Sequence, residues 1–266
     1  MAPQPGRRVA AVCVAAWLEL MLTGSAAPGR ADSLPAGFVH LAVVDASIRQ
    51  DMRYFTGDNF IGRRVEGYEA GTCILTRHAA EGLARVQQRL LPTHSLKVLD
   101  CYRPARAVAD FVTWAADLAD QKAKAHHYPT LDKRHLHDQG YISRNSAHSR
   151  GSAVDLTIVA LSPPTADGVV GGSVPSPVPS PCGLTAGASD TAEPELDFGT
   201  SYDCFHALSH TANPSVGRAA RRNRDWLIRE MALAGFRNYH REWWHFQLVT
   251  EPFQRAFDFP VIEPAE

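Results

Sequence analysis

The sequence predicts an α+β fold with a mainly antiparallel sheet and helices packed on one side of it. Stretches with helical and with strand patterning follow one another without the regular alternation of parallel α/β folds, and no repeat is present. The chain has 266 residues, of which 45% are hydrophobic and 21% are charged. This length and composition are sufficient for one sizeable core and favour a single domain with insertions.

Four elements are expected before the middle of the chain. Residues 40–48 (HLAVVDASI) have the apolar, β-branched composition of a strand. Residues 76–92 carry apolar side chains at helical spacing and end at a proline. Residues 96–102 (LKVLDCY) predict a second strand, which leads into a helix over residues 103–124 with Pro104 near its start.

The second half of the chain predicts further elements and an insertion. Residues 153–161 (AVDLTIVAL) indicate an apolar strand that contains one acid, and residues 223–235 indicate a helix that ends at a glycine. Residues 242–249 (EWWHFQLV) predict the last strand. Between these elements, residues 162–194 are rich in Pro, Gly, Ser and Ala, which predicts a Pro/Ser-rich insertion loop.

Residues 1–31 have the features of a secretory signal peptide. Two arginines precede an apolar stretch, and the small residues that follow it (SAAPGRADS) offer cleavage sites. The alternative is an uncleaved anchor, but the stretch is short for a hydrocarbon layer of about 30 Å. We therefore expect an exported, periplasmic bacterial protein whose domain spans residues 32–266 and which has no membrane contact after cleavage.

The charge balance argues against two classes of partner. The formal net charge is -1, and no long basic or acidic run is present. Neither a nucleic acid nor an anionic membrane surface is therefore expected as a partner. We expect a small-molecule substrate.

The cysteines predict disulfide bonds. Removal of Cys13 with the signal peptide leaves four, an even number in an oxidising compartment. None lies in a C-x-x-C pair, which argues against a cysteine zinc site; buried free thiols are the alternative. We expect Cys73 to pair with Cys101, and Cys182 with Cys204, because nearer partners close shorter loops.

Two histidines and one aspartate are candidate metal ligands. His148 precedes a turn at Gly151, and Asp155 lies in the following strand, where a buried carboxylate needs a facing cation. A catalytic zinc site uses three protein ligands, imidazole nitrogens and carboxylate oxygens among them, and leaves a fourth position for water. We predict one Zn²⁺ per chain, held by His148, Asp155 and His245.

The stretch HREWWHFQL places Glu242 three residues before His245. If the three predicted ligands hold the zinc, Glu242 is free to act as the base that takes a proton from zinc-bound water. In a regular strand, residues three apart point to opposite faces, so both can reach one metal only if a bulge, a turn or a strand start separates them; we expect this departure around Trp243. The spacing leaves open an edge strand in which His245 bonds a backbone carbonyl and the tryptophans pack in the core.

Seven segments occur in an order found in one enzyme family. They are DMRYFTGDNF, EGYEAGTCILTR, LDCYRPARAVADF, SAHSRGSAVDLTIV, RNRDWLIREMALAGF, EWWHF and FDFPV. The most specific patterns within them are S-x-H-x-x-G-x-A-x-D, E-W-W-H and D-x-Y-R-P. Over residues 39–261 the chain thereby resembles the D-alanyl-D-alanine dipeptidases, zinc enzymes related to the vancomycin-resistance dipeptidase.

The resemblance implies a fold and a reaction. The fold would be shared with D-Ala-D-Ala carboxypeptidases and the hedgehog signalling domain. The reaction would be zinc-dependent hydrolysis of D-alanyl-D-alanine by Glu242-assisted attack of zinc-bound water. Arg103 would hold the scissile carbonyl oxygen and its developing charge, a task that suits a fixed guanidinium, and Asp100 would orient it. From the sequence alone, Arg103 would be interpreted as a surface charge.

The resemblance also implies substrate-binding residues. Asp203 would bind the substrate ammonium, helped by the backbone around Tyr54. Ser146 and the region of Tyr141 would receive the free carboxylate. From sequence alone, Asp203 could equally be a turn residue and Ser146 a helix cap.

Two features depart from the pattern of the family, namely the long insertion at residues 162–194 and Cys204 directly after Asp203. Both border the expected pocket mouth, so they affect the expected size of the substrate more than the chemistry. Two alternatives therefore stay open. One is a D,D-carboxypeptidase or endopeptidase acting on longer peptidoglycan peptides, and the other is a non-catalytic zinc-binding module.

Overall fold

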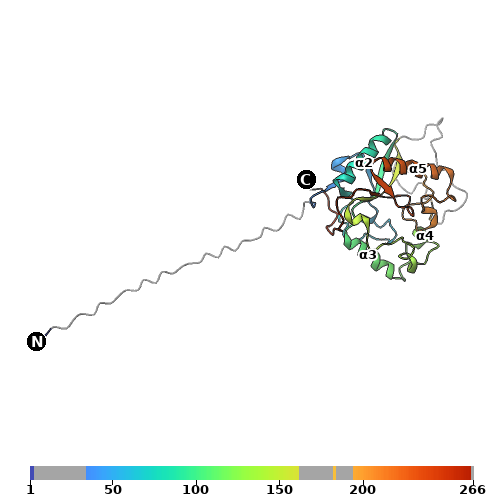
Figure 1. Cartoon of the computed structure of the whole chain (residues 1–266). Helices are drawn as coiled ribbons and strands as arrows, with labels where there is room; N and C mark the ends of the chain where they lie inside the picture. Colours follow the sequence, from blue (N-terminus) through green and yellow to red (C-terminus); the bar gives the residue numbers. More distant parts are fainter. Residues whose placement is uncertain (3–33, 162–181, 184–193, 265–266) are drawn as a thin grey trace. The chain divides into compact units, whose positions relative to one another are not determined.

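The structure is a computed structural model that describes residues 1–2, 34–161, 182–183 and 194–264 (Figure 1). The chain divides into residues 1–33 and a domain from Leu34 to Glu266. Nearly all of the predicted signal peptide and most of the predicted insertion lie outside the described residues. Among the described residues, no helix has both the length and the apolar character needed to cross a membrane.

A five-stranded sheet with the order β2-β4-β5-β7-β6 forms the centre of the domain. Its strands are β2 (Arg49–Gln50), β4 (His94–Asp100), β5 (Ala153–Ala160), β6 (Phe236–Asn238) and β7 (His245–Leu248). The β2–β4 pairing is parallel and the other pairings are antiparallel. A separate antiparallel pair joins β1 (Phe38–His40) to β3 (Ile74–Thr76). The predicted α+β class with a mainly antiparallel sheet is confirmed.

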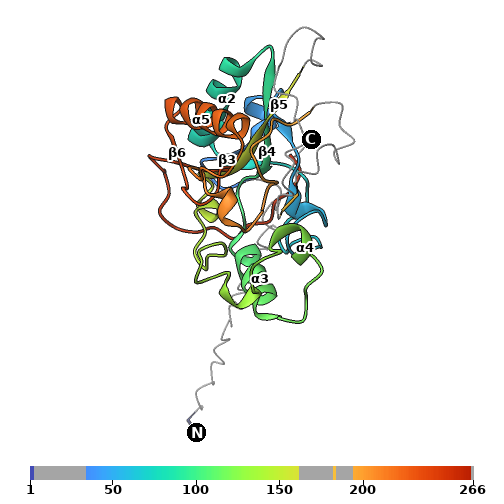
Figure 2. The same ribbon diagram turned by 90° about the vertical axis from the view of Figure 1, so that its right-hand side faces the viewer.

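The helices form two groups. The longer ones are α2 (Arg77–Leu90), α3 (Ala105–Ala116) and α5 (Arg218–Leu233); the short ones are α1 (Leu41–Val44), α4 (Lys124–His127) and the 3₁₀ turns η1 (Arg53–Phe55), η2 (Lys133–His135), η3 (Ala147–Arg150) and η4 (Ala207–Ser209). Helices α2 and α5 lie side by side and contact β4 and β6 respectively, whereas α3 lies apart from them and contacts η2 (Figures 1 and 2). The prediction of helices on one side of the sheet therefore holds for α2 and α5 but not for α3.

Strand β5 is buried at every position, so the sheet is covered on both faces along this strand. This burial explains its nearly continuous apolar sequence. It also means that Asp155, in the middle of an apolar strand and 3% exposed, must find its partners inside the protein.

Two of the elements predicted in the first half of the chain differ from the structure. Residues 40–48 were expected as one strand, but only His40 of them lies in a strand, and residues 41–44 form the helix α1 instead. Strand β1 ends at His40, because its partner β3 begins at Ile74 and offers no ladder beyond this pair. The helix predicted over residues 103–124 ends at Ala116. The buried ammonium of Lys133 lies 2.7 Å and 2.9 Å from the carbonyl oxygens of Asp117 and Asp120, and thereby fixes a turn where helix was expected.

The two predicted disulfide bonds are confirmed. Cys73 bonds Cys101, with 5.4 Å between their Cα atoms, and ties the residue before β3 to the residue after β4. Cys182 bonds Cys204 and joins the small described part of the 162–194 region to the segment that carries Asp203.

We therefore expect no free thiol in a protein that lacks residues 1–31. Titration with a thiol reagent after denaturation should detect none, and four after reduction, because the cysteines at 73, 101, 182 and 204 are all paired. The full-length chain is the control, since its additional Cys13 should give one thiol without reduction. Four reactive thiols in the unreduced, denatured short form would contradict both disulfides.

Candidate active site

The S-x-H-x-x-G-x-A-x-D segment forms a short turn followed by β5. Ser146 caps η3 by accepting a hydrogen bond from the backbone N–H of His148 at 3.2 Å, and Gly151 ends η3 with a φ of 76°. A Cβ at Gly151 would lie 2.2 Å from the ring of Phe38, so both the conformation and the space require glycine. The turn directs His148 toward Asp155 in β5.

The E-W-W-H segment is a turn rather than a strand. Strand β7 begins at His245, three residues later than predicted, and the backbone N–H of His245 bonds the carbonyl of Glu242. The side chain of Asn238 in β6 donates to the carbonyl oxygens of Glu242 and His245, both at 2.9 Å, and pins the turn. The expected departure from strand geometry around Trp243 is therefore present, and it brings both side chains to one site.

His148, Asp155 and His245 converge on one point. The Nε2 atom of His148 lies 3.1 Å from Nδ1 of His245 and 3.3 Å from Oδ1 of Asp155, and Oδ1 lies 2.9 Å from Nδ1 of His245. A search of the described residues for three or more His, Cys, Asp or Glu side chains that could hold a metal ion together finds these three.

The hydrogen bonds around this group fit a metal ligand set. The backbone carbonyl of Cys101 lies 2.7 Å from Nδ1 of His148, so this nitrogen donates and Nε2 is free to act as a ligand. Burial lowers the pKa of His245, which favours the neutral imidazole that ligation requires. Burial opposes ionisation of Asp155, but the facing imidazoles of His148 and His245 outweigh it and lower the pKa of this carboxyl. Two imidazoles and one carboxylate are the donor set of a zinc site.

Glu242 lies beside this group, with Oε2 3.9 Å from Nδ1 of His245. Its side chain is 14% exposed. Burial, together with the neighbouring carboxylates of Asp155 and Asp203, raises the pKa of Glu242 well above its ordinary value, while Arg103 opposes this. A carboxylate in such surroundings accepts a proton more readily than one in water.

Arg103 is held rigidly. Its Nε and Nη2 atoms donate to Oδ2 of Asp100 at 3.0 Å and 2.7 Å, and its guanidinium lies over the rings of Tyr54 and Phe111 at 5.0 Å and 4.8 Å. Asp100 is itself fully buried and accepts a hydrogen bond from the hydroxyl of Tyr68 at 2.6 Å. The predicted orienting contact between Asp100 and Arg103 is present, and Arg103 is not a surface charge.

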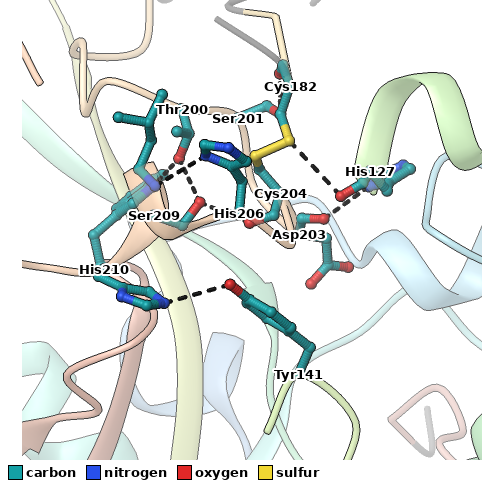
Figure 3. Close-up of a disulfide and its surroundings, with 12 residues drawn as sticks. His127, Tyr141, Cys182, Thr200, Ser201, Asp203, Cys204, His206, Ser209 and His210 are labelled. Atoms are coloured by element: carbon teal, nitrogen blue, oxygen red, sulfur yellow. Dashed lines mark hydrogen bonds between the residues drawn. A yellow bond between two sulfur atoms is a disulfide. The ribbon is translucent and has the colours of Figure 1, made fainter. Parts of the chain in front are cut away.

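Asp203 occupies a strained and buried position. It has a φ of 55°, is 4% exposed, and accepts a hydrogen bond from the hydroxyl of Tyr54 at 2.9 Å. Burial and the charge of Asp155 raise the pKa of Asp203 well above its ordinary value, although the hydrogen bond from Tyr54 opposes this. Figure 3 shows its carboxylate pointing away from the adjacent Cys182–Cys204 disulfide.

A buried arginine supports the segment that carries Asp203. Arg224 in α5 is 1% exposed and donates to the backbone carbonyls of Phe198, Leu208 and His210 at 2.8–2.9 Å. These bonds hold both ends of the segment against α5. They account for the burial of a charged side chain, which would be costly without such acceptors.

These residues surround a cavity of about 280 Å³. Nine of the predicted site residues line it: Tyr54, Arg103, Tyr141, Ser146, His148, Asp155, Asp203, Glu242 and His245. Asp100 lies behind Arg103. The ring of Tyr141 stacks on that of Phe205 with 5.3 Å between centroids, and its hydroxyl lies 3.4 Å from Nε2 of His210 (Figure 3).

The cavity has an excess of negative groups. Asp155, Asp203 and Glu242 line it and Asp100 lies next to it, whereas Arg103 carries the one fixed positive charge among the described residues that line it. Buried carboxylates are costly without cations. The surplus acids therefore suit a metal ion at one position and a cationic group of a ligand at another.

Comparison with known proteins identifies the family. The sequence model of the peptidase M15 family, described as D-ala-D-ala dipeptidase, matches residues 35–163 and 180–262. The chain belongs to this family. Three relatives, each a D-alanyl-D-alanine dipeptidase, come from Enterococcus faecalis (33% identical over 85% of this chain and 98% of the relative), Streptomyces coelicolor (34% over 81% and 94%) and Escherichia coli (29% over 84% and 88%).

As a member of the M15 family, the protein is a metallopeptidase, and peptidases of this family depend on zinc. The His148, Asp155 and His245 group is a possible site for such a metal. Several residues that shape this site in the M15 peptidase were not predicted from the sequence. They are Tyr68, Phe111, Tyr202, Arg224 and Asn238.

Proposed function

We propose that this M15 peptidase hydrolyses the dipeptide D-alanyl-D-alanine with one Zn²⁺ held by His148, Asp155 and His245. The names of the relatives support this substrate. The observation that carries the proposal is the buried carboxylate of Asp203 in the same cavity as the metal-ligand group.

The charged residues of the cavity favour a dipeptidase over the two alternative functions. A free dipeptide has a charged ammonium next to the scissile bond, and this group would neutralise Asp203. A carboxypeptidase or endopeptidase substrate has an uncharged amide at that position, which leaves Asp203 without a cation. A binding module has no need for Arg103 and Glu242 to face the same metal site.

Each residue of the site has a separate role in the proposed reaction. Zn²⁺, when bound, would supply a Lewis acid that polarises the scissile carbonyl and acidifies water. Glu242 takes the proton from the attacking water and passes it to the amine that leaves. Arg103, fixed by Asp100, stabilises the charge that develops on the carbonyl oxygen. Asp203 with Tyr54 binds the ammonium, and Ser146 near Tyr141 receives the carboxylate.

The decisive experiment compares four substrates with purified protein, with release of D-alanine, or of L-alanine from the L,L substrate, as the measurement. D-Ala-D-Ala should be cleaved. N-acetyl-D-Ala-D-Ala, which differs only in its blocked amino group, should be cleaved poorly, as should L-Ala-L-Ala and a pentapeptide stem. Equal cleavage of the acetylated substrate would favour the carboxypeptidase, and no cleavage of any substrate by zinc-loaded protein would favour the binding module.

Arg103→Ala should retain zinc and fold but lose about 10²-fold or more in kcat on D-Ala-D-Ala, because a donor to the developing oxyanion is removed. Arg103→Lys is a useful second variant, since it keeps the positive charge and loses the planar guanidinium that Asp100 holds. Turnover of Arg103→Ala near that of the wild type would remove this residue from the mechanism.

The proposal extends to the location of the protein. We place it in the periplasm after cleavage of residues 1–31, and the two disulfides are consistent with an oxidising compartment. Mass spectrometry of the protein in the periplasmic fraction should give a chain that begins near residue 32. A full-length chain in the cytoplasm would contradict export.

A further inference from the structure

The two carboxylate oxygens of Asp155 have different surroundings. Oδ1 faces the metal-ligand nitrogens, with Nδ1 of His245 at 2.9 Å and Nε2 of His148 at 3.3 Å. Oδ2 faces away from them and lies 3.0 Å from the hydroxyl of Tyr202. The guanidinium of Arg103 is more distant from Oδ2, at 3.7 Å, and is engaged by Asp100 at 2.7 Å.

Tyr202 is fixed in place by packing. Its side chain is 8% exposed, and its ring makes an edge contact with Trp244, with 5.4 Å between centroids. A buried hydroxyl at this depth needs a hydrogen-bond partner. Two acceptors are within reach, namely Oδ2 of Asp155 and the hydroxyl oxygen of Tyr54 at 3.2 Å.

A count of protons decides between these acceptors. Each phenol has one proton to donate. Tyr54 donates its proton to Oδ2 of Asp203 at 2.9 Å. If Tyr202 donates to Asp155, both buried carboxylates receive a proton donor; if it donates to Tyr54, Oδ2 of Asp155 keeps only the distant Arg103. The first arrangement is favoured, because a hydrogen bond to a charged acceptor is stronger than one to a neutral hydroxyl.

We propose that Tyr202 is a positioning residue that holds Oδ2 of Asp155 and thereby directs Oδ1 at the metal. Its neighbour Tyr54 performs the corresponding task for Asp203, so two hydroxyls 3.2 Å apart serve two different functions. Tyr202 sets the affinity for the metal, and Tyr54 sets the affinity for the amino group of the substrate. This inference rests on the proposed zinc site.

The test measures zinc dissociation constants by competition with a chromophoric chelator, together with kcat and KM for D-Ala-D-Ala at saturating zinc. Tyr202→Phe keeps the ring and removes the hydroxyl, so its zinc affinity should fall about 10-fold or more while KM is unchanged. Tyr54→Phe should show the reverse, with KM raised about 10-fold and zinc affinity unchanged.

Tyr102→Phe is the matched control. The hydroxyl of Tyr102 is also buried and bonds the backbone of Phe259 at 2.9 Å and 3.1 Å, but it does not line the cavity. This variant can lose stability but should bind zinc like the wild type. Melting temperatures of the zinc-free proteins report on folding, and zinc affinities are compared at a temperature at which the wild type and all variants are folded.

The outcomes separate this inference from the proposed function. Weaker zinc binding in Tyr202→Phe alone supports it. A wild type that binds zinc and cleaves the dipeptide, with Tyr202→Phe equal to it in zinc affinity, overturns the role of Tyr202 and leaves the proposed function intact. Equal losses of zinc affinity in Tyr202→Phe and Tyr102→Phe also overturn it, since a general loss of stability then accounts for the effect. A wild type that binds no zinc overturns both.

Discussion

His148→Ala, Asp155→Ala and His245→Ala are each expected to lose bound zinc and, with it, peptidase activity. Three protein ligands leave no spare one, and the atoms concerned lie within 4.8 Å of one another around a single position. Metal analysis of the dialysed proteins should find one zinc per chain in the wild type and none in the variants. Hydrolysis of D-Ala-D-Ala should fall to the background rate.

His78→Ala provides the control, because His78 is exposed on α2 and belongs to no candidate site. This variant should keep both zinc and activity. The variants at the site should remain folded, since the substitutions remove neither a disulfide nor a backbone hydrogen bond of the sheet. Stoichiometric zinc in any one of the three folded variants would remove that residue from the ligand set.

The central residues of the site could be found from the sequence because they lie in two short segments. A histidine before a glycine turn, an acid in an apolar strand and an E-x-x-H pair are each visible in one segment, and the chemistry of buried carboxylates links them. The turn around Trp243 also followed from local geometry, since strand alternation would have separated Glu242 from His245. The structure places all of them around one cavity.

Other features of the fold and of the site could not be predicted, because they depend on contacts between residues that are distant in the sequence. The helix end at Ala116 is set by Lys133, and the end of β1 is set by where β3 begins. Arg103 and Asp203 are charged residues in loops, and only the resemblance to a family gave them roles. Tyr202 became visible when the separation between its hydroxyl and Asp155 was known, because the two are 47 residues apart in the chain.

The variant Glu242→Gln should show whether Glu242 acts as a base or as a metal ligand. Glutamine preserves the shape of the side chain and its capacity to hydrogen bond, but it does not accept the proton of the attacking water. The variant should therefore keep one zinc per chain. Its kcat on D-Ala-D-Ala should fall by about 10²–10⁴-fold, the usual contribution of general acid and base catalysis.

The expectation that zinc stays rests on geometry. Oε2 of Glu242 lies 3.9 Å from Nδ1 of His245, whereas Oδ1 of Asp155 lies 2.9 Å from the same nitrogen, so Asp155 is the better placed third ligand. Glu81→Gln, at an exposed position on α2, is the matched control and should change neither zinc content nor kcat. Loss of zinc from Glu242→Gln would make this carboxylate a ligand and reopen the role of Asp155. Full activity with zinc retained would mean that another group accepts the proton. Two other carboxylates line the cavity, and one of them, Asp155, is the proposed metal ligand. Asp203 would then be the residue to replace next.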